Sequence, residues 1–180
     1  IPKRPEDAER AVELLAEALR PALTGNQPML SPIETELHIA RSYAEIEQLR
    51  LGSRVSVEYK TDPAAMHDPI PSLSLQPMLE NAFRHGAGNC SGPIRIQVTI
   101  ARNENTTILE ILNEPEPSQS TNESREWTSL LFREEHSLHN IASRLRALLG
   151  SEATLELQLR GPGEGRIRMT VPRRKEEQER

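Results

Sequence analysis

The sequence has few of the residues that build disulfides, nucleic-acid interfaces or membrane spans. It contains one cysteine in 180 residues, which excludes an intrachain disulfide framework and fits a reducing compartment. The formal net charge is −5, and no basic patch is interleaved with aromatic residues, so we do not expect nucleic acid as a partner. No apolar run approaches the roughly 20 residues that cross a bilayer. Because the chain starts at Ile1 rather than methionine, we expect a fragment, which leaves a membrane span in the parent protein open.

The length suits one domain of ordinary size with a short appendage. Residues 6–23 carry an apolar stripe at helical spacing, with acidic residues early and Arg20 late, the order that the helix dipole favours. A helix with one apolar stripe needs a partner, which is either the following domain or a second copy of itself. Residues 173–180 are almost all charged, and we expect them to form a frayed tail.

The remaining pattern predicts a layered α/β fold. Ser31-Pro32-Ile33-Glu34 has the capping-box pattern with proline at the first helical position, which predicts a helix that begins here and ends at Gly52. Another helix is predicted to end at Gly150. Alternation of apolar and polar residues predicts five strands, at residues 55–59, 94–100, 107–111, 155–159 and 167–171. We therefore expect a two-layer sandwich, in which three helices and an additional N-terminal helix accompany a mixed, largely antiparallel five-stranded sheet.

A central helix is predicted over residues 71–86. Its apolar residues recur at helical spacing and would pack on the core. Its polar residues are expected together on the other face, because residues three and four apart are neighbours on a helix. Oxygen donors and cations in such proximity could hold a hydrated Mg²⁺ and a polyphosphate, although an amphipathic helix with a solvated face is the alternative. The polar residues are Glu80, Asn81, Arg84 and His85.

Two segments resemble a known family. Residues 75–86, LQPMLENAFRHG, resemble the N-box of the LytS/AlgZ-type sensor histidine kinases, commonly L-Q-P-L-V-E-N-A-x-K-H-G. Residues 43–54, YAEIEQLRLGSR, are similar to the family's Y-L-x-I-E-x-x-R-x-G-D-R segment. The resemblance extends over about residues 6–172 and implies the GHKL-type ATPase fold that histidine kinases share with DNA gyrase and the Hsp90 chaperone.

The resemblance also implies a domain division and roles for the N-box. Residues 1–28 would be the end of the dimerisation helices and a linker, residues 29–172 the ATP-binding catalytic domain, and residues 173–180 a disordered tail. Within the N-box, Asn81 would ligate Mg²⁺ and Glu80 would be a neighbouring catalytic acid for water or metal. ATP phosphates would be contacted by Arg84 and His85.

The first glycine box departs from the family pattern. The family has D-N-G-x-G after the strand that we predict to end near Ile111, and its aspartate accepts a hydrogen bond from the adenine amino group. Here residues 113–117 read NEPEP. Asn113 could still accept through its side-chain oxygen and would face adenine, but it carries no charge. The prolines fix the backbone where glycines would let it approach the ligand.

The second glycine box has lost its glycines as well. Residues 134–145 align with G-x-G-L-x-N-V-x-x-R-L, and the glycines are replaced by Glu135 and Ser137. Asn140 keeps the family's nucleotide-binding position, and Arg144 is retained. Glycines at a helix start normally bring backbone amides to phosphates, whereas carboxylates there would repel them. We therefore expect weak or undetectable affinity for ATP.

Between the two boxes lies a polar segment that takes the place of the family's ATP lid. It is followed by residues 127–132, WTSLLF. One interpretation is a short helix that fills the core. The other is an apolar segment that occupies or shields the vacated adenine pocket.

The resemblance leaves two functional hypotheses open. The first is the catalytic domain of a two-component sensor histidine kinase, which would phosphorylate a histidine and pass the phosphoryl group to a response regulator. The second is a pseudokinase that keeps the fold and docks partners with little or no ATP binding. In either case the resemblance implies a homodimeric parent protein and a cytoplasmic domain, whether or not the parent is anchored in the inner membrane. No phosphoacceptor histidine is evident, so we expect the fragment alone to be inactive.

Overall fold

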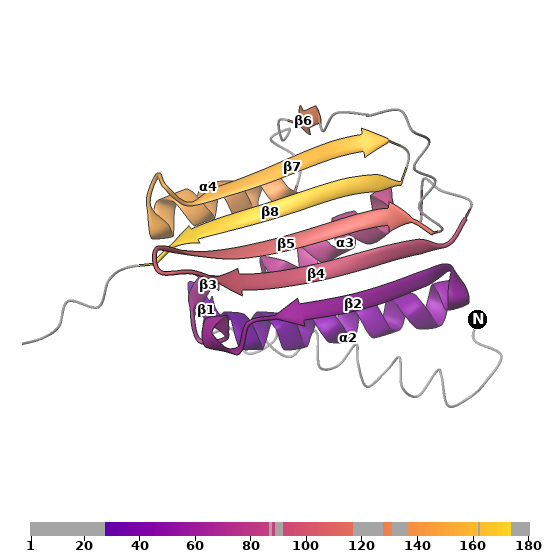
Figure 1. Ribbon diagram of the computed structural model, residues 1–180. Helices are drawn as coiled ribbons and strands as arrows, with labels where there is room; N and C mark the ends of the chain where they lie inside the picture. Colours follow the sequence, from indigo (N-terminus) through magenta and orange to yellow (C-terminus); the bar gives the residue numbers. More distant parts are fainter. Residues whose placement is uncertain are drawn as a thin grey trace, which may run out of the picture.

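The computed structural model describes residues 28–86, 88, 92–116, 128–130, 137–161 and 163–173. Within these residues, three helices cover one face of a six-stranded sheet (Figure 1). The first two strands of the sheet are parallel, and all other neighbours are antiparallel. The predicted two-layer α/β sandwich with a mixed, largely antiparallel sheet is therefore confirmed. The sheet order is β2 (Val55–Thr61), β4 (Ile94–Arg102), β5 (Thr106–Pro115), β8 (Glu164–Pro172), β7 (Thr154–Gly161) and β6 (Thr128–Leu130).

All five predicted strands are present, and the structure adds three short ones. β6 pairs with β7 at the edge of the main sheet, so the interpretation of residues 127–132 as a helix is wrong for residues 128–130. Trp127 and Phe132 lie outside the described residues. β1 (Leu30–Pro32) and β3 (Pro69–Pro71) form a separate two-stranded sheet.

Helix α2 (Ile33–Leu51) begins and ends where the sequence predicts, but no capping box forms. Pro32 occupies the N-cap position, and no side chain caps the helix there. Instead the amide of Ile33 donates to the carbonyl of Asp68 at 3.1 Å, and the amide of Glu34 donates to that of Met66 at 2.9 Å. Backbone groups from a distant segment thus satisfy the exposed amides of the first turn. At the other end the chain leaves the helix through Gly52, whose φ of 62° is a backbone conformation that glycine adopts without steric cost.

Helix α3 (Leu75–His85) is shorter than predicted, because the helix does not start at Pro71. Pro71 belongs to β3, and the amide of Ser72 still donates to the carbonyl of Met29 at 3.1 Å. Leu73 then turns the chain with a φ of 55°, a left-handed conformation that is costly for a branched side chain. The N-box helix therefore begins only after a strand and a tight turn.

The core lies between the sheet and the helices. Alternate residues of β4, β5 and β8 are buried on the helix side, as the period of two requires. Helix α4 (Ser137–Leu149) adds Leu138, Ile141 and Leu145, which are almost fully buried. Each such side chain contributes about 1.5–3 kcal/mol of hydrophobic stabilisation. The same alternation places Asn113 on the helix side of β5, after Leu109 and Ile111.

The predicted N-terminal helix at residues 6–23 and residues 174–180 of the predicted tail lie outside the described residues. Among the helices that the structure does describe, none combines the length and the apolar character that crossing a membrane would require.

Candidate nucleotide site

Asn81 lies inside the molecule rather than on a solvated face. Its side chain is 5% exposed, and its Oδ1 has no hydrogen-bond partner within the described residues. Glu80 and Arg84 lie at the surface and pair with each other, with Arg84 Nη2 2.7 Å from Glu80 Oε1. The expectation that these three side chains share one face is therefore wrong for Asn81. A buried oxygen without a hydrogen-bond partner is costly. Of the N-box residues, Asn81 is therefore the one whose side chain a bound ligand would stabilise most.

Asn113 lies in a tight space between two glycines. Its side chain is 3% exposed, and its Nδ2 donates to the carbonyl of Gly163 at 2.6 Å. A Cβ on Gly165, which faces Asn113 across the β5–β8 pair, would lie 2.9 Å from Asn113 Oδ1. A Cβ on Gly86, directly after α3, would lie 3.2 Å from Asn113 Nδ2. The carboxamide thus lies against two residues that lack side chains, and a Cβ on Gly165 would crowd its Oδ1.

These contacts bring part of the predicted site together. Asn113 touches the end of the N-box helix at Gly86, the residue after the half-buried His85. Asn140 lies on the first turn of α4 and is exposed. Its proposed contact with nucleotide stays a prediction.

The segment that replaces the first glycine box is a continuation of β5. Asn113 pairs with Ile96, and Pro115 pairs with Ile94. The side chains of Glu114 and Arg95 form an ion pair across the strands, and this hydrogen bond raises the pKa of the Arg95 guanidinium. The family's flexible loop is here a paired strand through Pro115.

Glu36 is a residue of this region that the sequence analysis missed. It is 2% exposed on the side of α2 that faces the core. Its carboxylate accepts hydrogen bonds from the amides of Leu73, Ser74 and Leu75 at 2.8, 3.0 and 3.4 Å. The available signal was an acidic residue inside the apolar stripe of the predicted helix, three residues after Ile33.

Tyr43 connects the middle of α2 with the N-box helix. Its ring packs edge-on against Phe83, with centroids 5.8 Å apart and an interplanar angle of 83°. Burial raises the pKa of the Tyr43 hydroxyl well above its usual value, and the nearby carboxylates of Glu47 and Glu80 act in the same direction. The hydroxyl therefore stays protonated at neutral pH, and α2 supports α3 with an uncharged aromatic contact.

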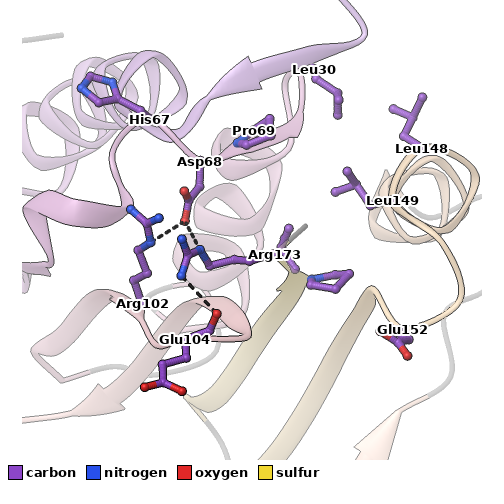
Figure 2. Close-up of a pocket in the computed structure, with 12 residues that line it drawn as sticks. Leu30, His67, Asp68, Pro69, Arg102, Glu104, Leu148, Leu149, Glu152 and Arg173 are labelled. Atoms are coloured by element: carbon purple, nitrogen blue, oxygen red, sulfur yellow. Dashed lines mark hydrogen bonds and ion pairs between the residues drawn. The ribbon is translucent and has the colours of Figure 1, made fainter. Parts of the chain in front are cut away.

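A cavity of about 780 Å³ lies at the other end of the sheet (Figure 2). Asp68 Oδ2 lies 3.6 Å from Arg102 Nε and 3.9 Å from Arg173 Nε, so one carboxylate pairs with both cations. Apolar side chains of α4, including Leu148, line the opposite wall. None of the predicted nucleotide residues lines this cavity, and both of its arginines, Arg102 and Arg173, are paired with Asp68.

The described residues contain no group of three or more His, Cys, Asp or Glu side chains that could hold a metal ion. A Mg²⁺ at Asn81 would therefore need most of its ligands from phosphate and water, which is the usual way in which proteins bind Mg²⁺ with nucleotides.

Comparisons with known proteins identify the fold and the relatives of this chain. Among solved structures, the histidine kinase domain of a blue-light activated histidine kinase from Erythrobacter litoralis EL346 aligns with a TM-score of 0.54 at 15% identity, covering 92% of this chain and 74% of that one. The histidine kinase ThkA, solved in complex with the response regulator protein TrrA, aligns with a TM-score of 0.53 at 10% identity, covering 96% and 50%. The fold is that of histidine kinase catalytic domains.

Sequence comparisons identify relatives of the chain among the sensor kinases. The profile of the family described as "Histidine kinase" matches residues 1–55. Sensor protein LytS of Oceanobacillus iheyensis is 26% identical over 160 residues, which cover 84% of this chain and 27% of LytS. Sensor protein kinase HptS of Staphylococcus aureus is 31% identical over 98 residues, which cover 54% of this chain and 19% of HptS. Over these residues the chain is similar to sensor histidine kinases of the LytS type, and it spans about a quarter of the length of these relatives or less.

Proposed function

We propose that the chain is the nucleotide-binding catalytic part of a two-component sensor histidine kinase, which uses Mg²⁺-ATP to phosphorylate a histidine. In this proposal residues 29–172 form the catalytic domain, and residues 1–28 form the end of the dimerisation helices with a linker.

The observation that carries the proposal is the buried, unpartnered Oδ1 of Asn81. Native proteins rarely leave a buried polar atom without a partner unless a ligand, ion or water satisfies it. A carboxamide oxygen is a suitable ligand for Mg²⁺. It lies on α3, whose C-terminal end reaches Asn113 through Gly86. The residues present thus fit a metal-nucleotide complex.

The remaining N-box residues fit supporting roles. Mg²⁺-ATP would supply the phosphoryl group and neutralise part of the phosphate charge. Arg84, with a side chain 61% exposed, can turn from Glu80 toward a phosphate, because an exposed ion pair is worth only about 0–1 kcal/mol. Glu80 then becomes available to orient water or metal. His85 follows Arg84 toward the end of the helix that approaches Asn113.

The partners follow from the same proposal. ThkA was solved with its response regulator, and we propose a response regulator as the phosphoryl acceptor here too. We also propose that the parent protein is a homodimer with its kinase domain in the cytoplasm, as the resemblance to the LytS/AlgZ-type kinases implies.

A thermal-melting experiment on the chain tests nucleotide binding. For a dissociation constant near 1 mM, about 10 mM Mg-ADP would add roughly 1.4 kcal/mol to the free energy of unfolding. For a domain of this size that raises Tm by about 3–6 °C. We expect this rise in the wild type and its loss in Asn81→Ala.

Asn105→Ala is the matched control, because Asn105 is exposed at the turn between β4 and β5, away from the site. It should keep the full rise. No rise in the folded wild type at this concentration would contradict the proposal, and the domain would then be a docking module without nucleotide.

A further inference from the structure

The turn before the N-box helix is held by three separate segments. The amide of Ser72 donates to the carbonyl of Met29, beside β1. The carbonyl of Ser72 accepts from Arg144 Nη1 on α4 at 2.9 Å. The following amides, from Leu73 onward, donate to the carboxylate of Glu36 on α2. Each of these backbone contacts therefore ties the turn to another segment.

Glu36 replaces the side-chain cap that α3 lacks. The first amides of a helix have no partner within the helix, and a residue at the N-cap usually accepts from them. Ser74 holds that position, but its hydroxyl donates to the carbonyl of Pro71 at 2.6 Å instead. The carboxylate of Glu36 accepts from two of them, the amides of Ser74 at the N-cap and Leu75 at the first helical position, at 3.0 and 3.4 Å. Its negative charge is favourable at the positive end of the helix dipole. Its burial at 2% exposure excludes the water that would otherwise compete.

We infer that Glu36 is a positioning residue, which fixes the N-box helix so that Asn81 presents its oxygen to the nucleotide; this rests on the proposed function above. Asn81 follows Leu75 by six positions, or about 9 Å along the helix axis. A helix of 11 residues moves as one body, so a shift at its start moves Asn81. The left-handed backbone of Leu73, with a φ of 55°, makes the turn dependent on such an anchor.

A purely structural role is the competing explanation, and Glu36→Gln tests it. The substitution keeps the side-chain volume but removes the charge and replaces one acceptor oxygen with an amide that cannot accept. We expect the dissociation constant for Mg-ADP to rise by about tenfold or more, which corresponds to about 1.4 kcal/mol. The measurement is a titration well below the melting temperature, where every variant is folded.

Asp68→Asn is the matched control. It makes the same chemical change at another shielded carboxylate, whose side chain is 14% exposed and lies 3.6 Å from Arg102 Nε, at the end of the sheet away from Asn113. We expect it to lower Tm while leaving the affinity for Mg-ADP within about twofold of the wild type. An unchanged affinity in Glu36→Gln would overturn the inference. So would a loss in both variants in proportion to the fall in Tm.

Hydrogen exchange, measured in the absence of nucleotide, tests whether Glu36 positions α3. In Glu36→Gln we expect faster amide exchange from Leu73 through α3, and a shift of the Asn81 side-chain amide resonance. Asp68→Asn should leave both unchanged. If the wild type binds no Mg-ADP, the proposed function fails, but this pattern still supports Glu36 as the residue that positions α3. Equal exchange of α3 in the two variants would contradict the inference even if nucleotide binds.

Discussion

At the scale of single residues, Asn113 shows why an apparent return to the family sequence could be unfavourable. Related kinases have an aspartate at this position, which accepts a hydrogen bond. In this chain the buried Nδ2 of Asn113 donates to the carbonyl of Gly163 at 2.6 Å. An aspartate would place an acceptor oxygen against another acceptor, in a space bounded by Gly86 and Gly165. The amide is therefore part of the folded structure and not only a weakened nucleotide ligand.

We predict that Asn113→Asp lowers the free energy of unfolding by about 1–3 kcal/mol, the cost of a buried polar group without its partner. The control is Asn103→Asp at an exposed turn. There Asn103 Oδ1 accepts from the amides of Asn105 and Thr106, at 2.9 and 2.7 Å, and an aspartate keeps both bonds. Urea unfolding of both variants at pH 7 checks the difference. Equal stability of Asn113→Asp and the wild type would show that the carboxamide is not needed as a donor.

The sequence identified Asn81 and Asn113 but not their surroundings. The family resemblance identified both residues, because a motif specifies residue types at fixed spacing. Polarity then placed Asn81 with Glu80 on a solvated face, since a carboxamide without a known partner is expected in water. Glu36 was missed for a related reason. Its hydrogen-bond donors lie 37 to 39 residues away, and no local pattern reports a contact of that kind.

At the scale of elements, local patterns predicted the long strands, the helix ends and the start of α2, but not the start of α3. The alternation of apolar residues gave the five long strands, because each has one face on the core. Gly52 and Gly150 end α2 and α4 as predicted, and both have positive φ values. The starts of α2 and α3 are set instead by bonds to distant backbone and to Glu36. β6 contains three residues, too few for a periodic signal.

The start of α3 depends jointly on α2 and α4, and this predicts energetic coupling between them. Glu36 holds the amides after Ser72, while Arg144 holds the Ser72 carbonyl. If Glu36→Gln lets the turn move, the bond from Arg144 is already weakened. We therefore expect the double variant Glu36→Gln/Arg144→Met to lose less stability than the sum of the two single variants. The shortfall should be at least about 0.5 kcal/mol, as for residues in one hydrogen-bond network.

Urea unfolding of the four proteins in this cycle measures the coupling. Arg146→Met is a suitable control, because Arg146 is exposed on the same helix. Its effect should add to that of Glu36→Gln without a shortfall. Full additivity of Glu36→Gln and Arg144→Met would mean that the two side chains hold the turn independently.

At the scale of the whole molecule, the two ends of the sheet carry different groups. Asn113 faces Gly165 at one end of the β5–β8 pair, and Thr106 faces Pro172 at the other. Seven residues separate these positions along β5, or about 24 Å at 3.4 Å per residue. The far end holds the pairing of Asp68 with Arg102 and Arg173 beside the cavity in Figure 2. The core between the two ends consists of apolar side chains. Among the residues that the structure describes, no ion pair links the two ends.

This separation predicts that changes at the two ends add. Asp68→Asn should lower the free energy of unfolding by about 1 kcal/mol, since its partners are two partly shielded arginines and the hydroxyl of Thr107. Combined with Asn113→Asp, the loss should equal the sum of the single losses within about 0.5 kcal/mol, as for sites that share no contact. Urea unfolding of the single and double variants gives the sum, and Mg-ADP titration of Asp68→Asn gives its effect on the site. A shortfall above 1 kcal/mol, or a nucleotide affinity that changes with Asp68, would show that the sheet transmits a change from one end to the other.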